Sequence, residues 1–317
     1  MNDSAKMPDA LLRVERISKS FGAVVALQDA TLHIPTGEIT GLVGDNGAGK
    51  STLIKIISGV LTPDAGSIEF GGKPANFASP AEAREQGIET VYQDLALVGN
   101  LAVWANVYLG RELTIGPRFL HILDRRSMLS KTGAMLDRFM RNVPPIDEPV
   151  ELLSGGQRQV VAIARAGAWG SKLILMDEPT AALGVAETKA VEDVIFELKR
   201  QGLTILVISH NLDQMFRITD GIWVMRRGHV IGYRETARTF PDEIVSMITG
   251  AAALAGTGAR HSVAGAGSRR SPSAVAFSLF SSCSSPACSR RRRRSGPIRT
   301  SSTSCSRTRS SESSPAA

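Results

Sequence analysis

A glycine-rich stretch near the start of the sequence has the residue types and spacing of a loop that binds phosphate. It matches the pattern G-x-x-x-x-G-K-[ST], and its residues are Gly44, Asp45, Asn46, Gly47, Ala48, Gly49, Lys50 and Ser51. Glycines let successive backbone N–H groups point at a phosphate, and a helix that starts at the end of the loop adds its positive dipole. We expect Lys50 to contact the β- and γ-phosphates of a nucleotide and the Ser51 hydroxyl to bind Mg²⁺, with Thr52 as a further contact.

Two carboxylates stand next to each other at the end of an apolar run later in the chain. The run "LILMDEP" (173–179) gives four apolar residues and then Asp177 and Glu178. Ligands of α/β proteins bind at the carboxyl ends of the strands. We therefore expect Asp177 to contact Mg²⁺, directly or through water, and Glu178 to act as the general base on an attacking water. Alone, the pair would be read as solvated strand-end acids, but the phosphate-binding loop favours the catalytic interpretation.

Two more polar residues end apolar runs in the same way. His210 closes "TILVISH" (204–210) and Gln93 closes "IETVYQ" (88–93). His210 would contact the γ-phosphate and help to hold the attacking water, and Gln93 would reach Mg²⁺ or that water. A lone histidine at a strand end is often only structural, and an amide there is often only exposed, so both alternatives stay open.

A second glycine loop occurs about a hundred residues after the first and has no lysine. In "ELLSGGQRQV" (151–160), the residues Ser154, Gly155, Gly156 and Gln157 precede a helical pattern. Such a turn brings backbone N–H groups up to an anion. These residues are therefore a second candidate nucleotide contact.

These residues are carried by alternating strand and helix patterns that run to about residue 250. Apolar runs, several of a kind buried on both faces, predict strands at 39–44, 88–93, 173–178, 204–210 and 222–233. The expected fold class is α/β with a mostly parallel core sheet. The stretch 94–170 has no comparable strand run and is expected to be an inserted helical subdomain. Ser79, followed by Pro80 and Glu82, marks a helix start, and Gly87 and Gly202 mark helix ends.

The composition changes abruptly after residue 250. Residues 260–317 hold eleven of the 37 basic residues and one of the 30 acidic ones, so this segment carries +10 and the residues before it −3. We expect 251–317 to be a disordered Ser/Arg-rich tail, either a basic arm for an anionic partner or a segment without a role. All three cysteines lie in it (283, 288 and 305), which leaves the body of the chain without a disulfide framework and suits the cytoplasm.

Together the motifs resemble the ATP-binding cassette (ABC) transporter family over residues 11–250, so that 1–250 would be one ABC ATP-binding domain. In that family the first loop is Walker A, residues 173–178 are Walker B and 153–157 are the signature LSGGQ. Gln93 would be the Q-loop glutamine and His210 the switch histidine. The resemblance implies a P-loop NTPase fold of ABC type, with an N-terminal antiparallel β-region, and ATP with Mg²⁺ as cofactors. Phe21, in "KSFGAVVAL", would stack on adenine; the alternative is a core phenylalanine.

The resemblance also explains the lysine-free loop, because cassettes pair head to tail as homodimers. The Ser154 hydroxyl, the Gly156 N–H and the helix start would complete the γ-phosphate shell of ATP held by the partner, whose Lys50 supplies the charge. The chain departs from the family after Walker B, where Gly184 replaces the usual aspartate of S-A-L-D. Communication between the two sites is the property that this change puts in question.

The sequences of the motifs are similar to those of importers of simple sugars of the ribose, fructose and xylose group, and most of all to those of the single-cassette fructose type. The implied function is ATP hydrolysis that energises import of a monosaccharide. The implied partners are a multi-span permease and, indirectly, a periplasmic sugar-binding protein. The chain would lie at the cytoplasmic face of the inner membrane through the permease, since no apolar run of its own reaches the length of a membrane span. The alternative is an ABC ATPase without a transporter that acts on ribosomes or nucleic acid, and we expect no nucleic-acid partner.

Overall fold

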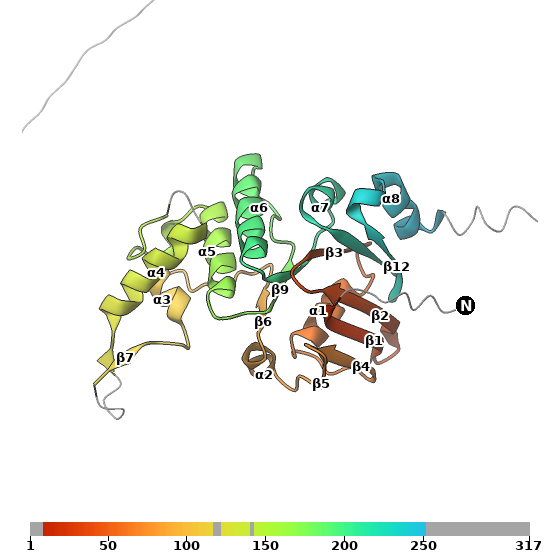
Figure 1. The fold of residues 1–317 in the computed structure, drawn as a ribbon, viewed down its shortest axis with the longest axis horizontal. Helices are drawn as coiled ribbons and strands as arrows, with labels where there is room; N and C mark the ends of the chain where they lie inside the picture. The colour runs from red at the N-terminus through yellow and green to blue at the C-terminus, as the bar shows by residue number, and fades with distance from the viewer. Residues whose placement is uncertain (1–8, 117–121, 140–142, 252–317) are drawn as a thin grey trace, which may run out of the picture. The chain divides into compact units, whose positions relative to one another are not determined.

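The computed structural model describes residues 9–116, 122–139 and 143–251 (Figure 1). The chain divides into two units, Met1–Ser262 and Val263–Ala317, and the second lies wholly outside the described residues. The expectation of a disordered tail therefore concerns residues that the structure does not describe. All elements below belong to the first unit.

The centre of this unit is a six-stranded sheet with the order β12-β11-β3-β10-β9-β6. Its strands are β3 (Ile39–Gly44), β6 (Ile88–Val91), β9 (Leu173–Asp177), β10 (Thr204–Ile208), β11 (Gly221–Arg226) and β12 (His229–Glu235). Neighbouring strands are parallel except for the β11–β12 pair. The expected mostly parallel α/β core is confirmed.

The prediction of one strand over 222–233 is wrong. The chain turns back at Arg227 and Gly228, whose φ angles are 48° and 81°, and β12 returns antiparallel to β11. Two successive residues with positive φ make the tight turn that suits the twist of a hairpin. Glycine at the second position favours that turn, and the apolar residues on both sides conceal it in the sequence.

A second sheet is antiparallel and has the order β2-β1-β4-β5. Its strands are β1 (Ala10–Phe21), β2 (Val24–Pro35), β4 (Ala65–Phe70) and β5 (Lys73–Ala75). Leu12 and Val14 of β1 point into the core in strict alternation, and Arg16, with φ 50°, then shifts the register so that Ile17 points inward again. This sheet is the antiparallel N-terminal β-region expected from the family resemblance.

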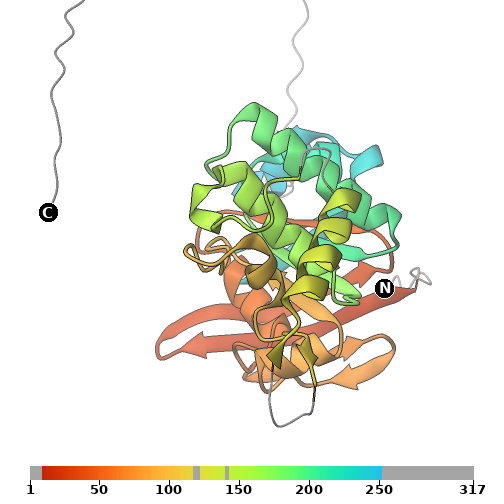
Figure 2. The ribbon, with the colours of Figure 1, turned by 90° about the vertical axis from the view of Figure 1, so that its left-hand side faces the viewer.

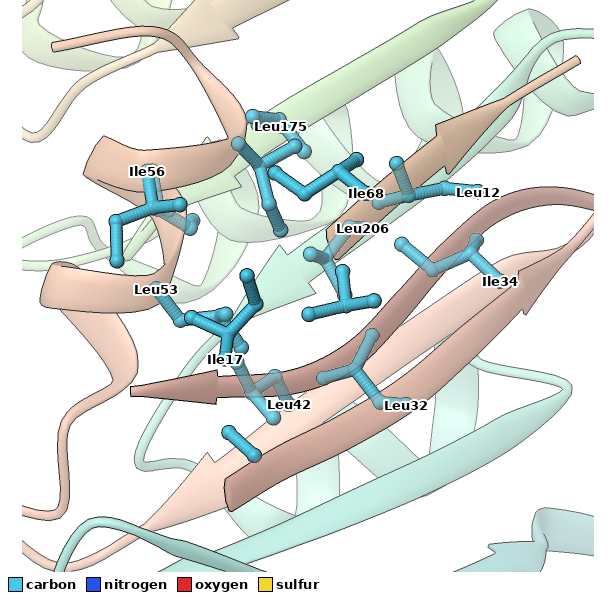
Figure 3. Packing of buried hydrophobic residues seen from close by; sticks show 14 of the residues in the cluster. Leu12, Ile17, Leu32, Ile34, Leu42, Leu53, Ile56, Ile68, Leu175 and Leu206 are labelled. Atoms are coloured by element: carbon cyan, nitrogen blue, oxygen red, sulfur yellow. The ribbon is translucent and has the colours of Figure 1, made fainter. Parts of the chain in front are cut away.

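The core lies on both faces of the central sheet, because the middle strands are apolar on both sides. On one face, helix α1 (Lys50–Ile57) lies between the two sheets and packs Leu53 and Ile56 against Leu42 of β3 and the inward residues of β1 and β2 (Figure 3). This packing fixes the start of α1, where Lys50 stands. Each large aliphatic side chain buried there stabilises the fold by about 1.5–3 kcal/mol.

The other face of the central sheet is covered by helices. They are α5 (Gly155–Gly167), α6 (Val185–Arg200), α7 (Leu212–Ile218) and α8 (Pro241–Thr249). Gly41 of β3 lets α7 approach closely, since a Cβ there would lie 3.1 Å from the Met215 sulfur and 3.2 Å from the Thr219 methyl carbon. Helix α2 (Pro80–Glu85) begins at the expected cap, where the Ser79 hydroxyl accepts the Glu82 N–H. A short turn of helix, η2 (Thr236–Arg238), precedes α8.

The stretch 94–170 contains mostly helices, which face the viewer in Figure 2. Besides α5 it holds α3 (Val103–Tyr108), α4 (Arg125–Phe139), the short η1 (Val150–Leu152) and the strands β7 (Thr114–Ile115) and β8 (Ile122–Leu123). The β7–β8 pair departs from the expectation of a stretch without strands. Two residues per strand are too few to give a period in the sequence. Among the described residues, no helix combines the length and apolar character needed to cross a membrane.

Candidate functional site

The polar residues singled out in the sequence end parallel strands and so meet at one edge of the central sheet. Asp177 ends β9 in register with Ile208 of β10, two residues before His210. Val91 of β6 pairs with Met176 of β9, which places Gln93 just beyond the same edge. The phosphate-binding loop follows β3, whose Leu42 pairs with Ile208. The structure therefore places all four predicted segments along one edge, with the Gln93 side chain exposed.

The phosphate-binding loop needs glycine at two positions because other backbone atoms come close. A Cβ at Gly49, whose φ is 103°, would lie 2.7 Å from the Ala26 carbonyl oxygen and equally close to a Leu27 methyl carbon. A Cβ at Gly44 would collide with the Met225 carbonyl oxygen. The loop is therefore clamped between β2 and β11, which fixes its backbone before any ligand binds. Asp45, Asn46 and Gly47 form its exposed tip, and Ala48 is buried below it.

Lys50 is nearly buried at the first turn of α1. Its ammonium group donates hydrogen bonds to the carbonyl oxygens of Gly44 at 2.7 Å and Asp45 at 2.9 Å. Burial lowers the pKa of Lys50, while the nearby carboxylates of Glu178 and Asp177 oppose that shift. The loop thus holds a cation at its centre that can exchange two backbone oxygens for the oxygens of a phosphate. Thr52, next to the exposed Ser51, is only partly buried.

Asp177 and Ser51 bring two oxygen groups together beside that cation. Burial and then the charge of Glu178 raise the pKa of Asp177, while Lys50, Lys55 and a hydrogen bond with Ser51 act in the other direction. A carboxylate and a hydroxyl are the hard oxygen donors that Mg²⁺ prefers. Within the described ranges there is no cluster of three metal-binding His, Cys, Asp or Glu side chains. The donors present fit a Mg²⁺ ion that also takes phosphate oxygens of a nucleotide, which is the usual mode for this ion.

Glu178 is paired with His210 and held in an unusual backbone conformation. The His210 Nδ1 lies 2.9 Å from each carboxylate oxygen of Glu178. The Glu178 side chain is only 18% exposed and that of His210 is 72% exposed. Glu178 has φ 53°, which costs about 1–2 kcal/mol for a residue other than glycine and is typical of functional positions. This conformation takes Glu178 out of the extended backbone of β9, which ends at Asp177.

The sequence analysis missed Gln214, a buried glutamine that joins the segments after β9 and β10. Its Oε1 accepts hydrogen bonds from Thr180 Oγ1 at 2.7 Å and from Ser209 Oγ at 3.4 Å. It therefore ties the loop that follows Glu178 to the loop that precedes His210. The spacing Asn211-x-x-Gln214, with Asn211 capping α7, is the only sequence signal, and it indicates a helix start rather than a brace.

The second glycine loop caps the start of α5. The Ser154 hydroxyl accepts the Gln157 N–H at 3.2 Å, and the Gln157 side chain accepts the Ser154 N–H at 2.9 Å. Helix α5 packs on α3, α4, α6 and β6, whereas α1 packs on β2 and β3. The two glycine loops thus lie at different places in the fold, one at the start of α1 and the other at the start of α5 (Figure 1).

Glu187 of α6 is a further residue that the sequence analysis missed at this second loop. Its carboxylate accepts the Gly156 N–H at 3.3 Å and the Gly184 N–H at 3.2 Å. Hydrogen bonds from Gly184, Gly156 and the Ser154 side chain lower its pKa. The only signal in the sequence is the spacing Gly184-x-x-Glu187, which predicts a cap of α6 and not a contact with α5.

Phe21 lies at the end of β1 and is 48% exposed, so the alternative of a core phenylalanine is wrong. It pairs with Val24 across the hairpin, and Ala26, two residues further, contacts Gly49 of the phosphate-binding loop. The Lys19 ammonium lies 5.8 Å from the centre of its ring. An exposed ring anchored beside the loop is suited to stacking on a base.

A cavity of about 380 Å³ lies near Gln93, between the central sheet and the helices of 94–170. Arg84, Glu89, Arg111, Arg165 and Trp169 are among its lining residues. Arg111 forms an ion pair with Glu89 at 2.5 Å and lies 5.1 Å from the centre of the Trp169 ring. The lining contains three arginines and one glutamate, so the cavity carries a net positive charge.

Comparison with known proteins identifies the family. Residues 27–181 match the family described as ABC transporter. The chain is 46% identical over 239 residues to the xylose/arabinose import ATP-binding protein of Sulfolobus acidocaldarius, covering 75% of this chain and 94% of that protein. It is 44% identical over 247 residues to the fructose import ATP-binding protein of Rhizobium meliloti, covering 77% of this chain and 95% of that one.

A solved structure supports the same assignment. The ADP conformation of an ATP-binding cassette of an ABC transporter is 29% identical, with a TM-score of 0.66, and the match covers 78% of this chain and 97% of that one. The P-loop NTPase fold of ABC type is thereby confirmed. The chain belongs to the ATP-binding cassette family of ABC transporters.

Proposed function

We propose that this chain is the ATP-binding and ATP-hydrolysing subunit that energises monosaccharide import by an ABC transporter. The observation that carries the proposal is the convergence of the phosphate-binding loop, Asp177, Glu178 and His210 on one edge of the central sheet. Relatives that match over nearly their whole length are import proteins for xylose, arabinose and fructose. A ribose import relative from Burkholderia cenocepacia is matched over 47% of its length, so import of ribose by this single cassette has weaker support.

In the proposed mechanism the phosphate-binding loop holds the triphosphate through its backbone N–H groups, and Lys50 turns from the Gly44 and Asp45 carbonyls to the β- and γ-phosphates. Ser51, Asp177 and Gln93 would hold Mg²⁺, which would neutralise phosphate charge. Glu178 takes a proton from the attacking water. His210, anchored by Glu178, contacts the γ-phosphate from the exposed side of the pair.

The proposed working form is a homodimer in which each signature loop meets the nucleotide of the other chain. Support comes from the separate positions of the two glycine loops, each of which contacts different elements of the chain. A 26% identical cassette with a TM-score of 0.58 has been solved as a dimer bound to ADP and phosphate. Gly155 and Gln157 would shape the signature loop, while Ser154 and Gly156 would donate to the γ-phosphate.

The cavity near Gln93 is the proposed docking place of a cytoplasmic helix of the permease. Its walls join the Gln93 segment to the helices of 94–170, so a partner seated there would touch both parts. Through that partner the chain would sit at the cytoplasmic face of the inner membrane. A periplasmic binding protein would act on it only indirectly.

The test reconstitutes the full chain with its permease in vesicles and measures ATP hydrolysis with and without a sugar-loaded binding protein. Stimulation by the loaded binding protein is the expected result. Stimulation by RNA or DNA in the absence of the permease would instead indicate an ABC ATPase that acts on nucleic acid.

A further inference from the structure

A backbone donor of the signature loop is already occupied by an anion of the same chain. The Gly156 N–H donates to Glu187 Oε1 at 3.3 Å, and the nearby Ser154 hydroxyl helps, after Gly184 and Gly156, to lower the pKa of this carboxylate. The Ser154 oxygen accepts the Gln157 N–H, which leaves its hydrogen free for Glu187. Of the two donors that the proposed function assigns to the partner's γ-phosphate, the Gly156 N–H is therefore taken, and the Ser154 hydroxyl lies beside the same carboxylate.

The side chain of Glu187 crosses Gly156 at a distance that only glycine allows. A Cβ at position 156 would lie 2.8 Å from both Cβ and Cγ of Glu187 and 3.1 Å from its Cδ. The absence of a side chain at Gly156 thus permits this contact within the chain as well as the approach of a nucleotide. The contact therefore depends on glycine at position 156.

The N-terminal ends of two helices hold this carboxylate in place. Its Oε2 accepts the N–H of Gly184, the residue before α6, while its Oε1 faces the start of α5. Both helix starts carry a partial positive charge that favours an anion. Because Gly184 has no side chain of its own, the carboxylate of Glu187 caps α6, and it adds a negative charge at the start of α5, which Ser154 caps.

We propose that Glu187 is a built-in competitor of the nucleotide: it holds the signature donors in the open chain and must release them before the dimer closes on ATP. A single N–H hydrogen serves one acceptor well, and two anions at one pair of donors repel each other. On release, Glu187 keeps its bond to Gly184 and continues to cap α6. The inference rests on the proposed function, since it concerns the regulation of the same composite site.

The test measures the Mg-ATP concentration at which half of the protein dimerises, using sedimentation velocity on the full chain. The parent protein carries Glu178→Gln so that hydrolysis does not remove the ligand. Adding Glu187→Gln keeps the size of the side chain and removes its charge, and we expect the midpoint to fall about tenfold. Glu187→Ala removes the acceptor altogether and is expected to act in the same direction. The matched control is Glu197→Gln, the same change on the same helix, where the carboxylate accepts a hydrogen bond from Gln201.

Ionic strength separates competition from a purely structural role. If the carboxylate competes through its charge, the difference between the parent and Glu187→Gln narrows as salt is raised. An unchanged or raised midpoint in both Glu187 variants would overturn the inference and leave Glu187 as a cap of α6. If the parent itself fails to dimerise with Mg-ATP, the proposed function fails, and this inference fails with it.

Discussion

Replacing Glu178 by glutamine distinguishes a general base from an anchor for His210. In the structure Glu178 could serve either purpose, since both of its oxygens lie 2.9 Å from His210 Nδ1. The substitution keeps the size of the side chain and one hydrogen-bond acceptor but removes the ability to take a proton. The two roles differ in the size of the effect that follows.

The two roles predict very different losses in the rate of ATP hydrolysis. His210 is 72% exposed, and an ion pair with such a partner contributes at most about 1 kcal/mol, so losing the pair alone would slow the reaction by no more than about fivefold. Losing a general base costs about 10²–10⁴ in rate. ATP binding should not weaken, because Glu178 raises the pKa of Asp177 and its neutral replacement leaves Asp177 more readily ionised for Mg²⁺.

The assay is single-turnover hydrolysis of ATP by the full chain with its permease, with Mg-ATP binding measured on the same sample. The expected result is a loss of at least a hundredfold in rate with binding retained. Glu192→Gln is the matched control, since Glu192 is also shielded and pairs with the half-exposed Arg217 at 2.7 Å, away from the site. A loss below about tenfold would refute the role of Glu178 as the base.

Three further predictions concern the dimer, the tail and the metal site. Mixed dimers of a Lys50→Ala chain and a Gly155→Asp chain should trap nucleotide that neither homodimer traps, because one composite site stays intact. Position 155 has room for a side chain, since a Cβ there would lie 3.6 Å from its nearest neighbour atom beyond the helix. If verified mixed dimers trap no more nucleotide than the homodimers, action in trans is excluded. Truncation after Gly258 should leave the Tm and the ATPase rate unchanged, as measured by calorimetry and phosphate release, since the last described helix ends at Thr249. Burial raises the folded-state pKa of Asp177, so ionisation of this carboxyl group costs stability as the pH rises through that pKa. Asp177→Asn should therefore raise the Tm of the nucleotide-free chain at neutral pH, lose that advantage in acid, and abolish the extra rise in Tm that Mg-ATP gives. A lower Tm of this variant at neutral pH would contradict the reasoning.

The middle strands of the central sheet were predictable because they are buried on both faces. The runs at 39–44, 173–178 and 204–210 are apolar without alternation, and each matches its strand to within two residues. The loop that follows the first run and the polar residues that end the other two then fall at the ligand edge by topology alone. The hairpin at Arg227 and Gly228 was missed because the prediction joined two short apolar runs across residues 226–229, which are not apolar and contain the turn.

The contacts of Glu187 and Gln214 could not be predicted because they join segments that only the fold brings together. Each residue has a local spacing that predicts a helix cap, and each does stand at a helix start. The partner of Glu187 lies on α5, and those of Gln214 lie in the loops after β9 and β10. Sequence spacing carries no information about such neighbours, whereas capping is a purely local property.

The pairing of β3 bears on how the chain acquires its nucleotide site during synthesis. Ile39 pairs with Ile205, and the other neighbour of β3 is β11, so both partners of this strand lie in the last third of the described chain. Closing such long loops is entropically costly and slows folding. The antiparallel sheet and the helices of 94–170 can form earlier from near neighbours. A nascent chain that ends before β10 contains every residue of the phosphate-binding loop, yet it lacks both strands that pair with β3 and the β11 backbone that lies against Gly44. We therefore expect the loop to reach its final geometry only when β10 and β11 have joined the sheet.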